Sequence, residues 1–292
     1  MFQSILVGTD FSEDAARALT VTCRWADALA ADVTLVHVRT PLGDLDLDPP
    51  MLASLAAYQE MLAERVRAQL DALVVPPALR AQRVSLVAES AAAGLVAHAG
   101  VCGADLIAVG SHGRGALARL LTGSVADRVT RMASCPVLVV PPSESAGEAK
   151  GRAVIAPVDF SGGSRAGASV AASLARALGL RLVLLHVVDP TGHPAFYISD
   201  KHSVSEAFPN LKARCRHKMG ELLATLGPDS HTEIVVAEGR EHVKIAEIAA
   251  EHGAEAVVMS SKGLGGGVAG MLGSITAKVL GTARCPVLVV GA

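Results

Sequence analysis

Short apolar runs alternate with longer helical segments along the whole chain. In the first half, runs 5–9, 33–38, 83–88, 105–110 and 136–140 are typical of strands, and Ala/Leu-rich segments at about 13–30, 51–73, 91–102 and 120–133 are typical of helices. The second half predicts strands at 153–158, 182–187, 232–237, 255–260 and 286–290, with helices near 164–178, 203–226, 240–252 and 272–283. This alternation predicts an α/β fold of right-handed βαβ units on parallel sheets, and strands this apolar predict helices on both faces.

The two halves correspond to each other residue by residue. Asp10 in TDFS corresponds to Asp159 in VDFS, 149 residues later, and Cys135 in SCPVLVV corresponds to Cys285 in RCPVLVV, 150 residues later. A single net insertion over half a chain indicates two tandem domains rather than a solenoid. We expect domains at 1–142 and 152–292, joined by a linker at 143–151 that is rich in Ser, Gly and charge.

Composition narrows the class of protein. The chain has 292 residues, 51% of them hydrophobic, 3% aromatic and 18% charged, with a net charge of −2. This charge gives no reason to expect a nucleic acid or an anionic membrane as partner, and the few aromatics argue against single-stranded nucleic acid. We expect no signal peptide and no transmembrane helix. Five scattered cysteines predict a reduced, cytoplasmic protein with buried thiols.

A glycine pattern occurs near the end of each half. Gly110, Gly113, Gly123 and Ser124 fit G-x2-G-x9-G-S, and the second copy has Gly263, Gly273 and Ser274 but Ser260 in place of the first glycine. Glycines after a strand let backbone approach a phosphate, and the helix that follows Gly123 would direct its free N–H groups at the same anion. The alternative is a flexible loop with a Ser N-cap. Repetition of the spacing favours a phosphate cradle.

Further candidates follow the first and second strands of each half. Asp10 and Asp159 could have a structural role and cap the next helix. Their functional alternatives are to accept a hydrogen bond from a ribose hydroxyl or to hold Mg2+ near phosphates. Val38 and Val187, at the ends of the second strands, either read an adenine edge or are plain core. We expect His37 and His186 to be structural.

Loop residue His112 and its counterpart Lys262 are candidates to donate a hydrogen bond to a phosphate. The alternative is that both are solvated loop side chains. The chain has no G-x4-G-K-[ST] motif, and the formal G-x-G-x-x-G match at 265–270 precedes the last helix instead of following the first strand. The sequence therefore predicts neither a P-loop nor a dinucleotide-binding fingerprint.

Taken together, TDFS and VDFS, the His-Val pairs, the glycine motif and CPVLVV, in this order and twice, resemble the universal stress protein family in its tandem two-domain form. The resemblance implies doubly wound domains, each with a five-stranded parallel sheet of order 3-2-1-4-5. It also implies that the last strands meet across a pseudo-twofold axis as an intramolecular pseudo-dimer, and leaves further homodimers open.

The resemblance implies ATP, accompanied by Mg2+, as the adenine nucleotide bound. Aspartates would serve the ribose, valines at the second strands the adenine edge, and the loop and helix residues the phosphates and ribose. The implied residues are Asp10, Val38, Gly110, His112, Gly113, Gly123, Ser124 and Val125 in the first half and Asp159, Val187, Gly263, Gly273, Ser274 and Ile275 in the second. Ser260 departs from the motif.

The expected function is that of a nucleotide-dependent regulator or sensor in the stress response, with at most weak ATP hydrolysis. We assign no catalytic residue and no metal ligand in the protein. Two alternatives stay open, a slow ATPase or phosphotransferase, which would need metal ligands and a positioned nucleophile, and an interaction scaffold that binds no nucleotide.

Overall fold

The computed structural model describes residues 1–41, 49–112, 123–142, 152–189, 210–227, 231–263 and 271–291. The linker predicted at 143–151 and the candidate Gly113 lie outside these ranges. The strands are β1 (Ser4–Gly8), β2 (Asp32–Arg39), β3 (Ala81–Val87), β4 (Leu106–Gly110), β5 (Val137–Val140), β6 (Ala153–Pro157), β7 (Arg181–Val188), β8 (Thr232–Glu238), β9 (Ala254–Ser260) and β10 (Val287–Val290). The helices are α1 (Glu13–Leu29), α2 (Pro49–Asp71), α3 (Ala91–Cys102), α4 (Ser124–Met132), α5 (Gly162–Leu178), α7 (Leu211–Thr225), α8 (Glu241–Glu251) and α9 (Ser274–Thr282).

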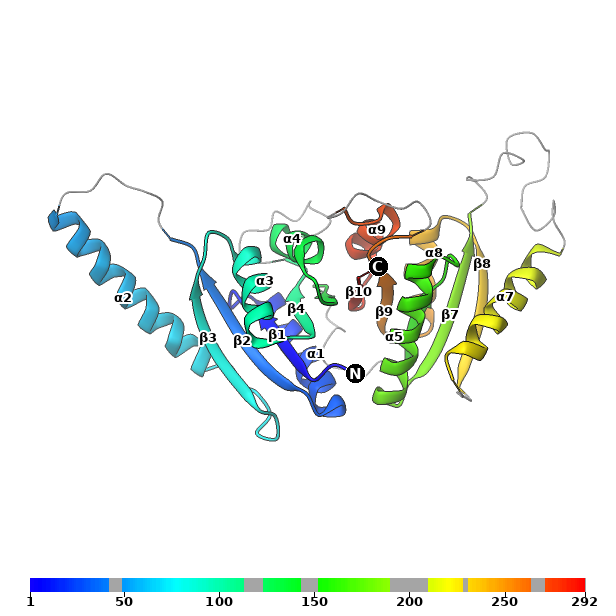
Figure 1. Cartoon of the computed structure of the whole chain (residues 1–292), viewed down its shortest axis with the longest axis horizontal. Coiled ribbons are helices and arrows are strands. Elements are labelled where there is room, and N and C mark those ends of the chain that lie inside the picture. The colour runs from blue at the N-terminus through cyan, green and yellow to red at the C-terminus, as the bar shows by residue number, and fades with distance from the viewer. Residues whose placement is uncertain are drawn as a thin grey trace.

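All ten strands belong to one sheet, in the order β3-β2-β1-β4-β5-β10-β9-β6-β7-β8. Neighbours within each half are parallel, whereas β5 and β10 pair antiparallel, with Leu138 opposite Leu288. The two halves therefore lie side by side, with α2 at one end of the molecule and α7 at the other (Figure 1). The α/β class is confirmed, and the two five-stranded sheets are continuous with each other.

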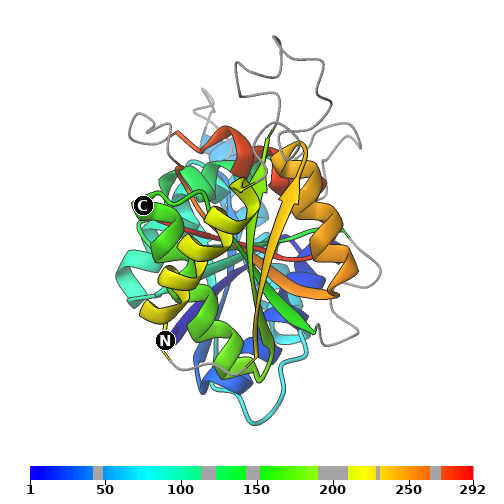
Figure 2. The same cartoon turned by 90° about the vertical axis from the view of Figure 1, so that its right-hand side faces the viewer.

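Helices cover both faces of the sheet because the strands alternate their apolar side chains between two core layers. Ile5 and Val7 of β1 pack in one layer with α1, α2, α5 and α7, while Leu6 packs in the other with α3, α4, α8 and α9. Figure 2 shows α5 and α7 on one side of the strands of the second half and α8 on the other. This is the doubly wound arrangement, which brings all parallel strand ends of a half to one edge.

The expected helices differ from those observed mainly at their ends. The helix expected at 120–133 begins only at Ser124, because Gly123 is its N-cap, in extended backbone. The helix expected at 203–226 is described from Leu211 onward, and residues 203–209 lie outside the described ranges. None of the helices in the described part of the chain combines the length and the apolar character that a membrane crossing requires.

All five cysteines are free thiols, but the expectation that they are buried is only partly correct. Cys23 and Cys215 are buried, whereas Cys102, Cys135 and Cys285 are partly exposed. Desolvation raises the pKa of Cys23 to about 11 and that of Cys285 to about 12. These two thiols therefore stay protonated and unreactive at neutral pH.

Candidate functional site

In the first half, the predicted residues meet at one cavity of about 430 Å3 at the carboxyl ends of β1, β2 and β4. Its wall includes seven of the eight candidates of this half, namely Asp10, Val38, Gly110, His112, Gly123, Ser124 and Val125. The eighth, Gly113, lies outside the described residues. The position is the edge at which parallel α/β sheets bind their ligands, and the volume is in the range of small-molecule sites.

The second half has an equivalent cavity of about 520 Å3 at the ends of β6, β7 and β9. It is lined by all six candidates of that half, which are Asp159, Val187, Gly263, Gly273, Ser274 and Ile275. Ser260 and Lys262 also line it. Residues that lie more than 100 positions apart in the chain thus converge twice, in the same arrangement.

Gly123 and Gly273 allow the loop after the strand to contact the start of the following helix. The N–H of Gly123 donates to the carbonyl oxygen of Ser111 over 2.6 Å, and a Cβ at Gly123 would lie 2.7 Å from that oxygen. In the second half, Gly273 donates to Ser261 over 2.7 Å. Ser124 and Ser274 are the first residues of α4 and α9, and neither helix has a side-chain N-cap. The alternative of a Ser N-cap is therefore wrong.

Gly110 has a packing role in addition to the phosphate contact that the sequence predicts. A Cβ at Gly110 would lie 2.8 Å from the backbone carbonyl carbon of Asp14 in α1, so this glycine permits close packing of the strand end against a helix. In the second half the roles are exchanged. Ser260 stands in place of Gly110, and Gly163 stands in place of Asp14. A Cβ at Gly163 would lie 3.1 Å from the Cβ of Ser260. The departure at Ser260 is therefore accommodated by a glycine on α5.

The serine itself is also satisfied within its loop. The Ser260 hydroxyl donates to the carbonyl oxygen of Lys262 over 2.6 Å, and Ser260 is 8% exposed. Its side chain therefore stabilises the loop beside the cavity.

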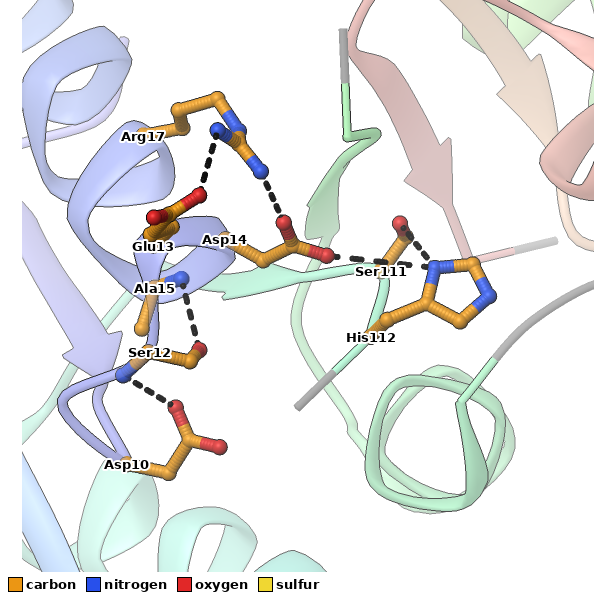
Figure 3. Close-up of polar contacts among 8 residues, drawn as sticks. All are labelled: Asp10, Ser12, Glu13, Asp14, Ala15, Arg17, Ser111 and His112. Carbon is orange, nitrogen blue, oxygen red and sulfur yellow. Dashed lines mark hydrogen bonds and ion pairs between the residues drawn. The ribbon is translucent and has the colours of Figure 1, made fainter. Parts of the chain in front are cut away.

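The two aspartates have the same local geometry. Asp10 Oδ1 accepts from the N–H of Ser12 over 3.0 Å, and Asp159 Oδ1 accepts from Ser161 over 3.0 Å. The helix N-cap is the serine in each case. The Ser12 hydroxyl accepts from the N–H of Ala15 (Figure 3), and the Ser161 hydroxyl accepts from the N–H of Ser164. The aspartates thus hold the turn before the helix and also line the cavities.

The turn after each first strand contains a feature that the sequence did not indicate. Phe11 and Phe160 have positive φ values of 63° and 66°, a conformation that is strained for a bulky residue. Each phenyl ring lies near a histidine ring, with centroids 4.6 Å apart for Phe11 and His37 and 4.7 Å for Phe160 and His186. Repetition of Asp-Phe-Ser was the available signal.

The histidines on β2 and β7 each contact the backbone after the neighbouring first strand, and both also line the cavities. The Nδ1 atom of His37 lies 2.8 Å from the carbonyl oxygen of Thr9, and that of His186 lies 2.7 Å from the carbonyl oxygen of Val158. A carbonyl can only accept, so Nδ1 carries the hydrogen. Each histidine thereby fixes the end of the neighbouring first strand.

His112 lies in a charged environment at the loop end of the first cavity. Its Nδ1 is 3.0 Å from the Ser111 hydroxyl and 3.9 Å from Asp14 Oδ2, and Asp14 also pairs with Arg17 (Figure 3). In the second half, Gly163 replaces Asp14, Ala166 replaces Arg17 and Lys262 replaces His112. The second loop therefore presents a fixed positive charge without the neighbouring carboxylate.

Glu241 is a cavity residue that sequence reasoning missed. It lines the second cavity from the first turn of α8, where the first cavity has Ala91. Desolvation by burial, followed by the charges of Asp189 and Asp159, raises the pKa of the Glu241 carboxyl, and Lys278 acts in the opposite direction. No motif marked Glu241, because only the fold brings the start of α8 to the cavity.

Within the described ranges, no three His, Cys, Asp or Glu side chains form a group that could hold a metal ion.

The chain is similar in sequence to known proteins over its whole length and over one half. A universal stress protein of Mycolicibacterium smegmatis is 29% identical over 293 residues, which cover 98% of this chain and 96% of that protein. A universal stress protein of Thermus aquaticus is 37% identical over 140 residues, 48% of this chain and 99% of that protein.

Among solved structures, the fold is similar to that of a universal stress protein from Archaeoglobus fulgidus. The TM-score is 0.68 at 18% identity, and the match covers 99% of this chain and 98% of that one. The universal stress protein family matches the chain twice, over residues 1–141 and 151–291. The chain therefore belongs to the universal stress protein family, in its tandem two-domain form.

Proposed function

We propose that the chain binds an adenine nucleotide, ATP with Mg2+, in each of its two cavities and acts as a nucleotide-dependent regulator or sensor in the stress response. The observation that carries this proposal is the convergence of the described glycine-motif residues with the strand-end aspartate and valine at one cavity in each half. In this proposal residues 1–142 and 152–292 are the two domains, and the chain is an intramolecular pseudo-dimer.

The start of α4 and the start of α9 would receive the phosphates. Neither helix has a side-chain cap, so their first N–H groups are available to an anion, and the positive end of the helix dipole favours one. Ser124 and Ser274 would add hydroxyl donors. Mg2+ would be held mainly by phosphate oxygens and water, which suits an ion that retains much of its hydration shell.

The residues at the ends of the first and second strands of each half would receive the nucleoside. Asp10 and Asp159 would accept from the ribose, and the backbone at Val38 and Val187 would contact the adenine edge. Both domains have this aspartate and this valine. In the second domain, Ser260 and Gly163 replace Gly110 and Asp14, and the second cavity stays open. We therefore include both cavities in the proposal.

Nucleotide that co-purifies with the protein tests this function. The purified chain is denatured, and the released small molecules are separated by anion exchange. We expect ATP or ADP in the wild type and reduced amounts in Gly123→Val and Gly273→Val, because these side chains would prevent the loop from closing on the helix. Gly100→Val is the control, since a Cβ there meets nothing within 4 Å. Equal amounts in all four proteins would contradict the proposed sites.

A further inference from the structure

The two cavities differ chemically at their nucleoside ends. Glu241 lines the second cavity, whereas Ala91 occupies the corresponding place in the first. Asp189, directly after β7, corresponds to Thr40 after β2. The second half thus has the carboxylates Glu241 and Asp189 at the positions where the first half has Ala91 and Thr40, and Glu241 lines the cavity.

The Glu241 carboxylate accepts no hydrogen bond from the part of the protein that the structure describes. In the described part of the chain, no hydrogen bond or ion pair reaches it, and its charged neighbours Asp159 and Asp189 are of the same sign. The cation that acts on Glu241 is Lys278 of α9, not Lys262 of the loop. A half-buried carboxylate in this setting is stabilised by a ligand that donates a hydrogen bond, and repels a phosphate.

The second carboxylate, that of Asp159, indicates which hydrogen-bond donors of a ligand would suit this cavity. Glu241 and Asp159 come from different elements and line the same cavity. Two carboxylates in one cavity match two adjacent hydroxyl donors. In a nucleotide, the ribose cis-diol provides that pair.

We propose that Glu241 is a specificity-determining residue that accepts a hydrogen bond from a ribose hydroxyl, so that the second cavity selects ribonucleotides over deoxyribonucleotides more strongly than the first. This inference rests on the proposed nucleotide binding and adds the selectivity of one cavity. In the first cavity, Asp10 acts alone opposite Ala91.

Calorimetric titration of the full-length chain tests this selectivity with MgATP and its 2′,3′-dideoxy analogue. Gly123→Val leaves the second cavity available, and Gly273→Val leaves the first. We expect the preference for ATP over the dideoxy analogue to be about tenfold larger in the second cavity, the usual effect of one hydrogen bond to a charged group. Adding Glu241→Ala should reduce the preference to that of the first cavity, while Glu241→Gln, which retains an acceptor, should keep part of it.

The possible results separate this inference from the proposed function. If MgATP binds the second cavity but the preference is equal in both cavities, or unchanged by Glu241→Ala, the inference is wrong and nucleotide binding stands. A second outcome would also overturn the inference. If Glu241 makes the second cavity reject inosine triphosphate and not the dideoxy analogue, the carboxylate contacts the base and not the ribose. If MgATP does not bind the second cavity at all, both proposals fail for that half.

Discussion

At the scale of single residues, the glycine motif has more than one physical basis. The sequence predicts that Gly110, Gly123 and Gly273 let the backbone approach a phosphate, and the structure adds that a Cβ at each of them would lie close to the protein's own backbone. Gly110 makes room for the backbone of α1, and its counterpart Ser260 is tolerated because Gly163 makes room on α5. Such an exchange depends on contacts between residues about 97 positions apart, which no local pattern contains.

The glycines of α5 give a matched pair for testing this exchange. A Cβ at Gly163 would lie 2.9 Å from the Lys262 carbonyl oxygen, whereas a Cβ at the adjacent Gly162 meets nothing within 4 Å. We expect Gly163→Ala to lower the free energy of unfolding by about 1–3 kcal/mol through overpacking. Gly162→Ala should be neutral or raise it by up to about 1 kcal/mol. Denaturant unfolding measures both, and similar effects of the two substitutions would count against the exchange.

Glu241 gives a prediction for pH dependence. Desolvation and the neighbouring carboxylates raise its pKa in the folded protein, so the charged form costs stability at neutral pH. Glu241→Gln should therefore raise the melting temperature at pH 7.5. As the pH falls through the raised folded-state pKa toward the ordinary value, the wild-type carboxyl becomes protonated and this advantage disappears. Melting curves from pH 7.5 to 4 check this, and a constant difference would exclude the carboxyl as its source.

At the scale of elements, hydrophobic patterning predicted every described strand and helix, but helix starts depended on caps. The central strands were predictable because both of their faces are buried, which makes them continuously apolar, whereas the edge strands β3 and β8 are only partly buried and include polar residues. The start of α4 was misplaced because 113–122 contains apolar residues compatible with a helix, and the position of the N-cap at Gly123 depends on its hydrogen bond to Ser111. The repeated Asp-Phe-Ser marks Phe11 and Phe160 but does not reveal their left-handed backbone, and their histidine partners come from the next strand.

The serine caps of α1 and α5 should contribute equally to stability. The hydroxyl of Ser12 accepts from Ala15 and that of Ser161 from Ser164. Replacing either serine with alanine leaves an N–H without this acceptor, so each should lower the free energy of unfolding by about 1 kcal/mol. Thr20→Ala, in the exposed middle of α1, is the control and should cost less. A negligible effect of both serine substitutions would show that the caps do not stabilise these helices.

At the scale of the molecule, the repeat in the sequence predicted two similar halves, and the structure joins them through β5 and β10. The halves also meet through α1 and β9. The buried carboxylate of Glu255 accepts from Arg24 Nη2 over 2.6 Å and from Trp25 Nε1 over 2.8 Å. By the repeat, Arg24 and Trp25 correspond to Ser173 and Leu174. Because this contact is not repeated, the duplication could not reveal it.

Removing this carboxylate should weaken the junction between the halves. Glu255→Ala removes the acceptor of the buried Trp25 N–H and the ion pair that this carboxylate forms with Arg24. We expect a loss of about 2–4 kcal/mol in the free energy of unfolding. Trp25 is the only tryptophan in the chain, so its fluorescence reports the junction directly. Glu255→Gln, which keeps an acceptor, should cost less; unchanged stability and emission in Glu255→Ala would contradict the role of this contact.

The central claim is that one chain has two equivalent nucleotide cavities, and the stoichiometry of MgATP binding tests it most directly. In a calorimetric titration of the full-length protein, freed of co-purified nucleotide, the account predicts two MgATP bound per chain. It predicts one in Gly123→Val or in Gly273→Val, none in the double variant, and two in the control Gly100→Val. Saturable binding that neither substitution removes, or no saturable binding in the wild type, would contradict the account.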